Sequence, residues 1–157
     1  MTHDEFVASI REHYADLFDP DNTDQDRAYL ITVGPGWWPL LEEYCARSQA
    51  ILREHGEIGR WYIRQAKEKM GELRIYIRAA VERLNVDWYS ETVHDIDPPQ
   101  PTPVTELLSE LRSQIVERAN HTCEECGEPG ALRVLGGWYR TCCDRHYQEW
   151  QDRKGAQ

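Results

Sequence analysis

Four side chains near the end of the sequence have the types and spacing of a metal site. Cys123 and Cys126 are separated by two residues, and Cys143 and His146 repeat that spacing after sixteen intervening residues. A cysteine pair in a tight turn can hold one side of a tetrahedral ion, and residues at i and i+3 share a helix face that can complete it. The sequence therefore predicts one zinc ion bound by these four residues.

The ion is expected to have a structural rather than a catalytic role, because four protein ligands leave no coordination position for water or substrate. The run 119–127 is similar to the opening of zinc-stapled HNH endonucleases, but the residues between the ligand pairs contain no histidine that could serve as a general base. The zinc deaminase signature includes Pro-Cys-x-x-Cys, and Thr122 precedes Cys123 here. The sequence predicts no catalytic residue, and His121 is expected to cap or pack beside the turn.

The two other cysteines are not expected to form a disulfide. Cys45 falls on the apolar face of a predicted helix and is interpreted as a small core residue. Cys142 adjoins Cys143 and can replace it as a ligand in an alternative register. With no apolar run near the roughly 20 residues of a membrane span, and no secretion signal, the expected location is the cytoplasm.

The charge is unevenly distributed along the 157 residues, which sum to a net charge of −10. Residues 1–58 carry 12 acidic and 4 basic groups, whereas residues 59–90 carry 4 acidic and 7 basic groups. An acidic surface repels phosphate backbones, so only the segment 60–83 favours nucleic acid.

The elements that must position the metal site begin with a helix–strand–helix arrangement. Thr2 and Glu5 form a capping-box pattern before a helix that extends to about residue 17. A β-branched and aromatic run predicts a strand over 28–33, a Gly-Pro-Gly turn ends it, and helical periodicity covers 37–55. The acidic run 19–26 has the aspartate spacing of a calcium loop but lacks its glycine and glutamate, so a solvated loop is favoured.

Alternating residues over 60–67 and 72–78 predict a β-hairpin. Its outward face would carry Tyr62, Arg64, Arg74, Tyr76 and Arg78. Arginine interleaved with tyrosine can bind single-stranded nucleic acid by stacking and charge, or can anchor a protein partner. An ordinary solvated sheet face is the third interpretation of this pattern.

The proline-rich run 97–103 predicts a semi-rigid linker between a main domain, 1–96, and a second domain, 104–157. In the second domain, Thr105 is the predicted cap of a helix that ends near Asn120. A Cys-Cys knuckle, two short strands around Gly136-Gly137 and a ligand-bearing helix follow in the order of a treble-clef zinc finger. The predicted fold is α+β: a small antiparallel sheet packed on helices, with a C-terminal treble-clef zinc lobe.

Four segments resemble a family of small uncharacterised phage and prophage proteins, over roughly residues 30–150. They are GWWPLL at 36–41, QAKEKMGELRIY at 65–76, CEECGEPG at 123–130 and TCCDRH at 141–146. The family usually has Phe at the position of Met70, and the segment 79–103 is longer here than is usual. The resemblance implies the fold core and a phage context, and it implies no catalytic activity.

The expected function is therefore that of a non-enzymatic, zinc-stabilised protein that binds another protein. In the phage context, the expected partner is a host defence protein or a nucleic-acid-handling machine, which this protein would inhibit. A nucleic-acid-binding accessory protein is the alternative, using Arg60, Arg64, Arg74, Arg78 and the zinc lobe. An enzyme of unrecognised type ranks third.

Overall fold

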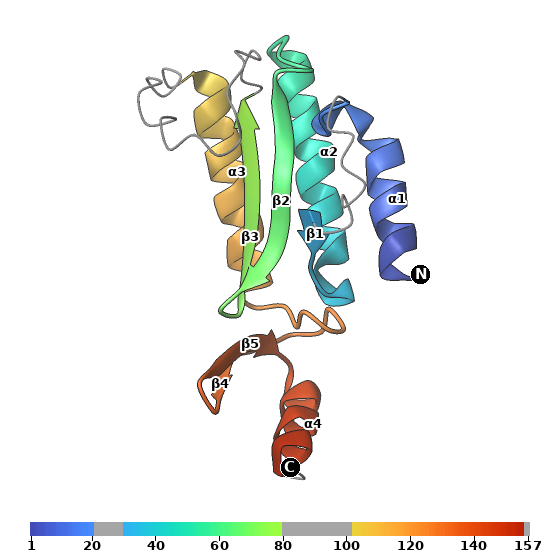
Figure 1. Ribbon diagram of the computed structural model, residues 1–157. Coiled ribbons are helices and arrows are strands. Elements are labelled where there is room, and N and C mark those ends of the chain that lie inside the picture. The colour runs from blue at the N-terminus through green and yellow to red at the C-terminus, as the bar shows by residue number, and fades with distance from the viewer. Residues whose placement is uncertain (21–29, 80–101, 156–157) are drawn as a thin grey trace, which may run out of the picture.

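The computed structural model describes residues 1–20, 30–79 and 102–155. Most of the acidic run, the segment 80–96 and most of the predicted linker lie outside these ranges. The described part of the first 120 residues forms a three-stranded sheet with two long helices behind it, and a shorter N-terminal helix lies beside them (Figure 1). Its α-helices and strands are α1 (His3–His13), β1 (Ile31–Thr32), α2 (Trp38–Glu54), β2 (Trp61–Lys69), β3 (Glu72–Ala79) and α3 (Pro103–Ala119), and short 3-10 helices cover Ala15–Leu17 and Pro35–Trp37.

The predicted α+β fold is confirmed, with one difference in strand direction. The predicted hairpin is present, since β2 and β3 pair antiparallel. However, β1 pairs parallel to β2, with Ile31 opposite Ala66, so the sheet is mixed rather than wholly antiparallel. The direction follows from the connection, because the chain passes from β1 through α2 to β2, and parallel neighbours need such a crossover.

The core lies between the sheet and α2 and α3. Helix α2 buries Leu41 and Tyr44 completely, β3 buries Leu73, and α3 buries Ile115 and Ala119 against the same cluster. The packing therefore joins α3 to the sheet, although the sequence grouped this helix with the zinc lobe. The division of the chain into two domains remains a prediction.

The N-terminal cap of α1 is the predicted one, whereas the cap of α3 lies three residues before the predicted position. Thr2 and Glu5 form the predicted capping box of α1. Helix α3 begins earlier than predicted: Thr102 is its cap, and Thr105 is the third helical residue, whose hydroxyl accepts from the Thr102 backbone N–H. Pro103 is tolerated in the first turn because an N–H there has no partner within the helix.

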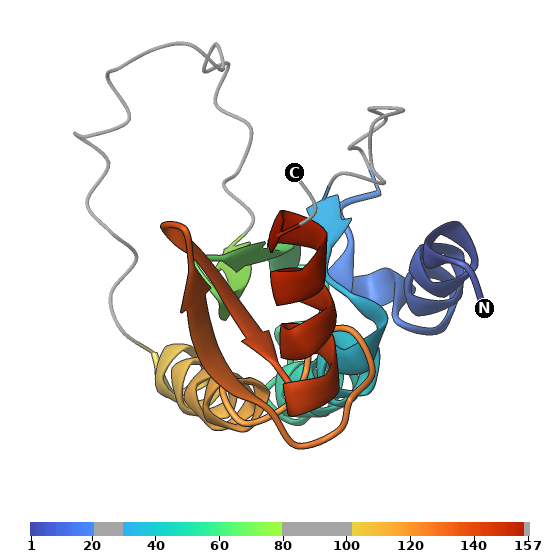
Figure 2. The ribbon, with the colours of Figure 1, turned by 90° about the horizontal axis from the view of Figure 1, so that it is seen from below.

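The last 35 described residues form a separate layer across one end of the sheet and helices (Figure 2). A two-stranded antiparallel sheet, β4 (Ala131–Leu135) and β5 (Trp138–Cys142), follows the Cys123–Cys126 turn, and α4 (Asp144–Gly155) follows β5. Turn, hairpin and helix thus occur in the predicted treble-clef order. Among the described residues, no helix combines the length and apolar character needed to cross a membrane.

Candidate metal centre

The four predicted ligands come together at one point in the C-terminal layer. Their ligand atoms all lie within 4.8 Å of one another. The Nδ1 atom of His146 is 3.3 Å from the Cys123 Sγ and 3.4 Å from the Cys143 Sγ, and the Sγ atoms of Cys126 and Cys143 are 3.9 Å apart. Bond lengths of about 2.3 Å to sulfur and 2.0 Å to nitrogen give tetrahedral edges of roughly 3.5–3.8 Å, so these three separations are close to those of a four-coordinate metal site.

Local backbone geometry explains how two separate segments present these atoms. In the first, the Gly127 N–H donates to the Cys123 carbonyl at 2.8 Å, and Gly127 has a φ of 79°, which favours glycine. In the second, Cys143 immediately precedes α4 and its carbonyl accepts from the Tyr147 N–H. One helical turn then places His146 on the same face as Cys143.

The cysteines have different electrostatic surroundings. Burial raises the pKa of the Cys123 thiol to about 11. The backbone N–H of His146, at the start of α4, lowers the pKa of the Cys143 thiol. A buried thiolate such as that of Cys123 is stabilised when a cation binds it, so the three cysteines and one histidine form a donor set that could hold a metal ion.

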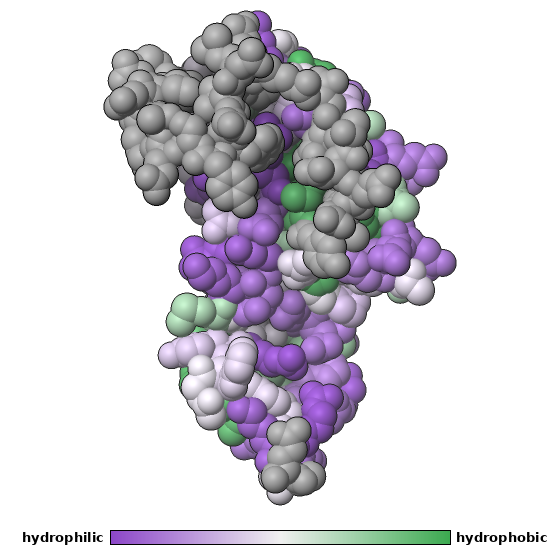
Figure 3. Space-filling view, viewed as in Figure 1, coloured by the Kyte–Doolittle hydropathy of each residue, from purple (hydrophilic) through white to green (hydrophobic). Residues whose placement is uncertain are grey.

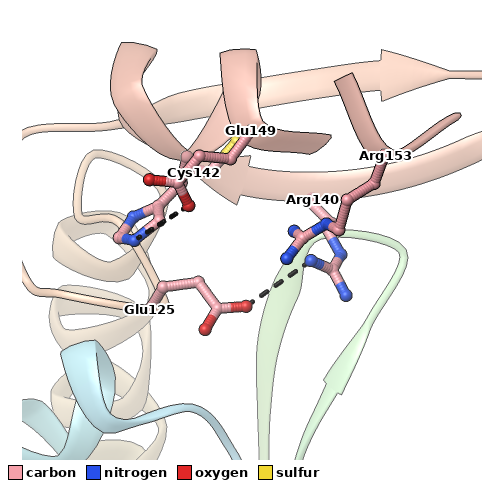
Figure 4. Close-up of a pocket in the computed structure, with 6 residues that line it drawn as sticks. Glu125, Arg140, Cys142, Glu149 and Arg153 are labelled. Carbon is pink, nitrogen blue, oxygen red and sulfur yellow. Dashed lines mark hydrogen bonds and ion pairs between the residues drawn. The ribbon is translucent and has the colours of Figure 1, made fainter. Parts of the chain in front are cut away.

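Beside the centre lies a cavity of about 120 Å³ lined by charged side chains (Figure 4). Glu125 and Arg140 face each other there at 3.5 Å, and Glu149 lies 4.0 Å from the Nε2 of His146. A carboxylate near the second ring nitrogen can orient a histidine ligand. Cys142 lines this cavity and is outside the four-residue cluster, so the alternative register is not the one adopted.

The turn before α2 lies directly against the ligand-bearing turn. The backbone N–H of Gly36 donates to the Glu124 carbonyl at 2.6 Å, and the Gly34 N–H donates to the Glu124 carboxylate at 2.9 Å. The Trp37 indole donates to the Thr122 carbonyl at 2.8 Å. Residues Gly34–Trp37 therefore support the turn that carries Cys123 and Cys126, a role that their sequence does not reveal.

A second contact joins the C-terminal layer to the tip of the β2–β3 hairpin. The buried Thr141 hydroxyl donates to the Gly71 carbonyl at 2.6 Å. A Cβ atom at Gly71 would lie 2.3 Å from the Leu132 side chain. Met70 and Gly71 form the hairpin turn with φ values of 56° and 79°, which are typical of the two central residues of a type I′ turn.

The five residues predicted to bind a partner lie along the outward side of the β2–β3 hairpin, but several of their polar groups are engaged within the molecule. Arg64 pairs with Asp19 at 3.2 Å, and the Tyr62 hydroxyl donates to the Gly59 carbonyl. Arg74 pairs with Glu72.

The strand register around Arg64 also differs from simple alternation. A bulge between Ile63 and Gln65 shifts the pairing, so Ile63 and Ala66, three residues apart, are both buried. Tyr62 and Arg78 are directly opposite each other, and Tyr76 is opposite Gln65. In Figure 3 the part of the sheet side that the grey atoms leave visible, above the C-terminal layer, is mainly hydrophilic.

Four of the seven exposed large apolar side chains among the described residues lie elsewhere, at the junction of the hairpin turn and the C-terminal layer. The exposed fractions are 60% for Met70, 54% for Leu132, 51% for Val134 and 38% for Tyr139. We call these four residues the junction patch. In Figure 3 the surface in the region of the β4–β5 hairpin is paler and greener than the sheet face above it. This patch was not predicted, although the alternation of Leu132 and Val134 in a short strand is the pattern that marks an apolar strand face.

Comparison with protein-family models, with curated proteins and with solved structures finds no match to this chain.

Proposed function

We propose that this protein is a non-enzymatic, zinc-stapled module that binds another protein through the junction patch. The observation that carries this proposal is the exposure of four apolar side chains, from two segments some 60 residues apart, on one junction. The largest exposed apolar patch of a typical soluble monomer covers about 300–600 Å² and is often a functional site.

Zinc is the ion that best suits the cluster. Three thiolates and one imidazole in a tetrahedron favour zinc over calcium or magnesium, which prefer oxygen ligands. All four positions are protein ligands, which favours a structural role over a catalytic one. A metal centre of this kind stabilises a layer whose own core is too small to fold alone.

Protein is the favoured class of partner because the cationic side chains proposed for nucleic acid are partly neutralised. Arg64 and Arg74 are ion-paired with carboxylates, and the whole chain carries a net charge of −10. Phosphate binding depends on accessible positive charge. The phage resemblance makes a host defence or nucleic-acid-handling protein the proposed target, with inhibition as the proposed effect.

A pull-down from host lysate with the zinc-loaded protein tests this proposal. Nuclease-treated and untreated lysates should yield the same stoichiometric protein partner. The Leu132→Lys variant should lose that partner, because a charge replaces an apolar contact in the patch. Leu107→Lys is the matched control, since Leu107 is an apolar residue of α3 with 37% exposure outside the patch.

Two outcomes would reject the proposal. Loss of all retained material on nuclease treatment would indicate direct nucleic-acid binding. Equal retention by wild type and Leu132→Lys would show that the junction patch is not the binding surface.

A further inference from the structure

We infer that the partner binds as an extended segment that adds a strand to the free edge of β4. This inference rests on the proposed function and specifies how the junction patch is used. In β-strand addition, main-chain hydrogen bonds supply affinity, and alternate side chains supply specificity.

The edge of β4 is available within the described part of the chain. Over residues 1–20, 30–79 and 102–155, β4 pairs with β5 and with no other strand. The backbone groups on the outer side of β4 therefore have no strand partner among these residues, and the Leu135 carbonyl at the end of the strand accepts from the Lys154 Nζ at 3.2 Å. A bare edge of this kind is a template for another strand.

Two residue types that normally protect an edge are missing from β4. The strand contains no proline and no lysine. Its single charged residue, Arg133, is turned toward α4, where it pairs with Asp144 and lies 5.1 Å from the centre of the Tyr147 ring. Its charge is thus directed away from the opposite face, on which an incoming strand would meet apolar side chains.

That opposite face already has the pattern of a strand-binding surface. Strand pairing places Leu132 opposite Thr141 and Val134 opposite Tyr139, so these four side chains share the face away from Arg133. Leu132 and Val134 are each more than half exposed. An added strand would lay alternate side chains beside them, as neighbouring strands in a sheet do.

The size and charge of the surface favour a short segment of another protein over a second copy of this chain. Four partly exposed side chains amount to a few hundred Å², well below the roughly 800 Å² per partner of a stable interface. Antiparallel pairing of β4 with itself about its centre would place Arg133 opposite Arg133 of the other copy. It would also bring together two chains that each carry a net charge of −10.

The segment that fits is extended, carries β-branched or other apolar residues at alternate positions, and is neutral or basic. Phage-displayed random 12-residue peptides, selected on the full-length zinc-loaded protein, test this directly. Enriched peptides should show the alternating apolar pattern, bind Leu132→Lys at least tenfold more weakly than wild type, and bind Leu107→Lys as tightly as wild type.

Hydrogen–deuterium exchange with an enriched peptide then tests the binding mode. Amides within 131–135 should gain protection on binding. Absence of enrichment, or binding without protection of these amides, would overturn strand addition. Dimerisation of the protein with protection of β4 would overturn it in favour of a second copy. The pull-down measures retention of a partner, whereas hydrogen–deuterium exchange measures protection of the β4 amides. Strand addition can therefore be rejected while the proposed function stands.

Discussion

The backbone N–H of Gly36 donates a 2.6 Å hydrogen bond to the carbonyl of Glu124, which lies between two cysteines of the candidate metal centre. This bond joins the turn before α2 to the metal centre across 88 positions of sequence. The centre is thus supported by the main body of the protein as well as by its own layer. The same arrangement fixes the β4–β5 hairpin next to the β2–β3 turn, where the junction patch forms.

Replacing Gly36 with alanine should lower the free energy of unfolding by about 3 kcal/mol, because overpacking against a rigid backbone cannot relax. The added Cβ atom would lie 2.0 Å from the Cys123 carbonyl oxygen and 2.4 Å from the Gly127 nitrogen. Urea unfolding followed by circular dichroism measures the change. Gly155→Ala is the control, since nothing lies within 4 Å of its added Cβ atom. Equal stability of the two variants would contradict the close contact.

Thr141→Val should lower the free energy of unfolding by about 1–3 kcal/mol. The substitution keeps the shape of the side chain but removes the hydroxyl that donates to the Gly71 carbonyl, leaving a buried acceptor without its donor. Thr141→Ser retains the hydroxyl and should recover part of the loss. If valine and serine variants unfold at the same urea concentration, the hydrogen bond does not hold the two layers together.

Met70→Asn should stabilise the fold and weaken partner binding at the same time. Met70 has a φ of 56°, a left-handed conformation that asparagine adopts more readily, so a gain of about 0.5–1 kcal/mol is expected. The substitution also removes the most exposed side chain of the junction patch. Thermal unfolding and quantitative pull-down together test this trade-off. If the variant is more stable and still binds its partner as well as wild type, Met70 does not belong to the binding surface.

Much of the metal centre was predictable because its information is local. Cysteines separated by two residues and a Cys-x-x-His at a helix start constrain their own geometry, and the four ligands come together as the spacing predicts. The supporting role of Gly34–Trp37 was not predictable, because it depends on contacts with Thr122 and Glu124 in a distant segment. The sequence of a turn does not indicate which part of the folded protein the turn will contact.

The sheet illustrates the same limit. Alternation predicted the β2–β3 hairpin, but simple alternation breaks at Arg64, where one extra residue shifts the strand and buries Ala66. Strand β1 pairs parallel to β2 because α2 forms the crossover connection between them, and the sequence of β1 alone does not show this. The junction patch arises from two segments that meet only in the folded chain, so neither segment predicted it alone.

The thiol of Cys45 should remain unreactive in the folded protein and should make stability fall at alkaline pH. Burial raises the pKa of Cys45 to about 12, from an ordinary value of 9. Because the folded pKa is the higher one, the stabilising contribution is complete below pH 9 and is lost as the pH rises toward 12. Alkylation at pH 8, read by mass spectrometry, should modify Cys45 only after unfolding.

Urea unfolding between pH 8 and 11 measures the alkaline dependence. Burial also raises the pKa of Tyr44 to about 12, from 10, and acts in the same direction. Cys45→Ala should therefore show a shallower decline than wild type, but not a flat one. Identical pH profiles for the two proteins would contradict a protonated thiol in the core.

We propose that Cys123, Cys126, Cys143 and His146 form one closed, four-ligand metal centre. Cobalt substitution followed by visible absorption spectroscopy, with metal content measured on the same samples, distinguishes a closed centre from an open one. The predicted result is one ion per chain, intense tetrahedral bands with thiolate charge transfer, and a spectrum that azide does not change, because no coordination position is open. Weak octahedral bands, or bands that shift when azide binds, would contradict a closed structural site and favour an enzyme instead.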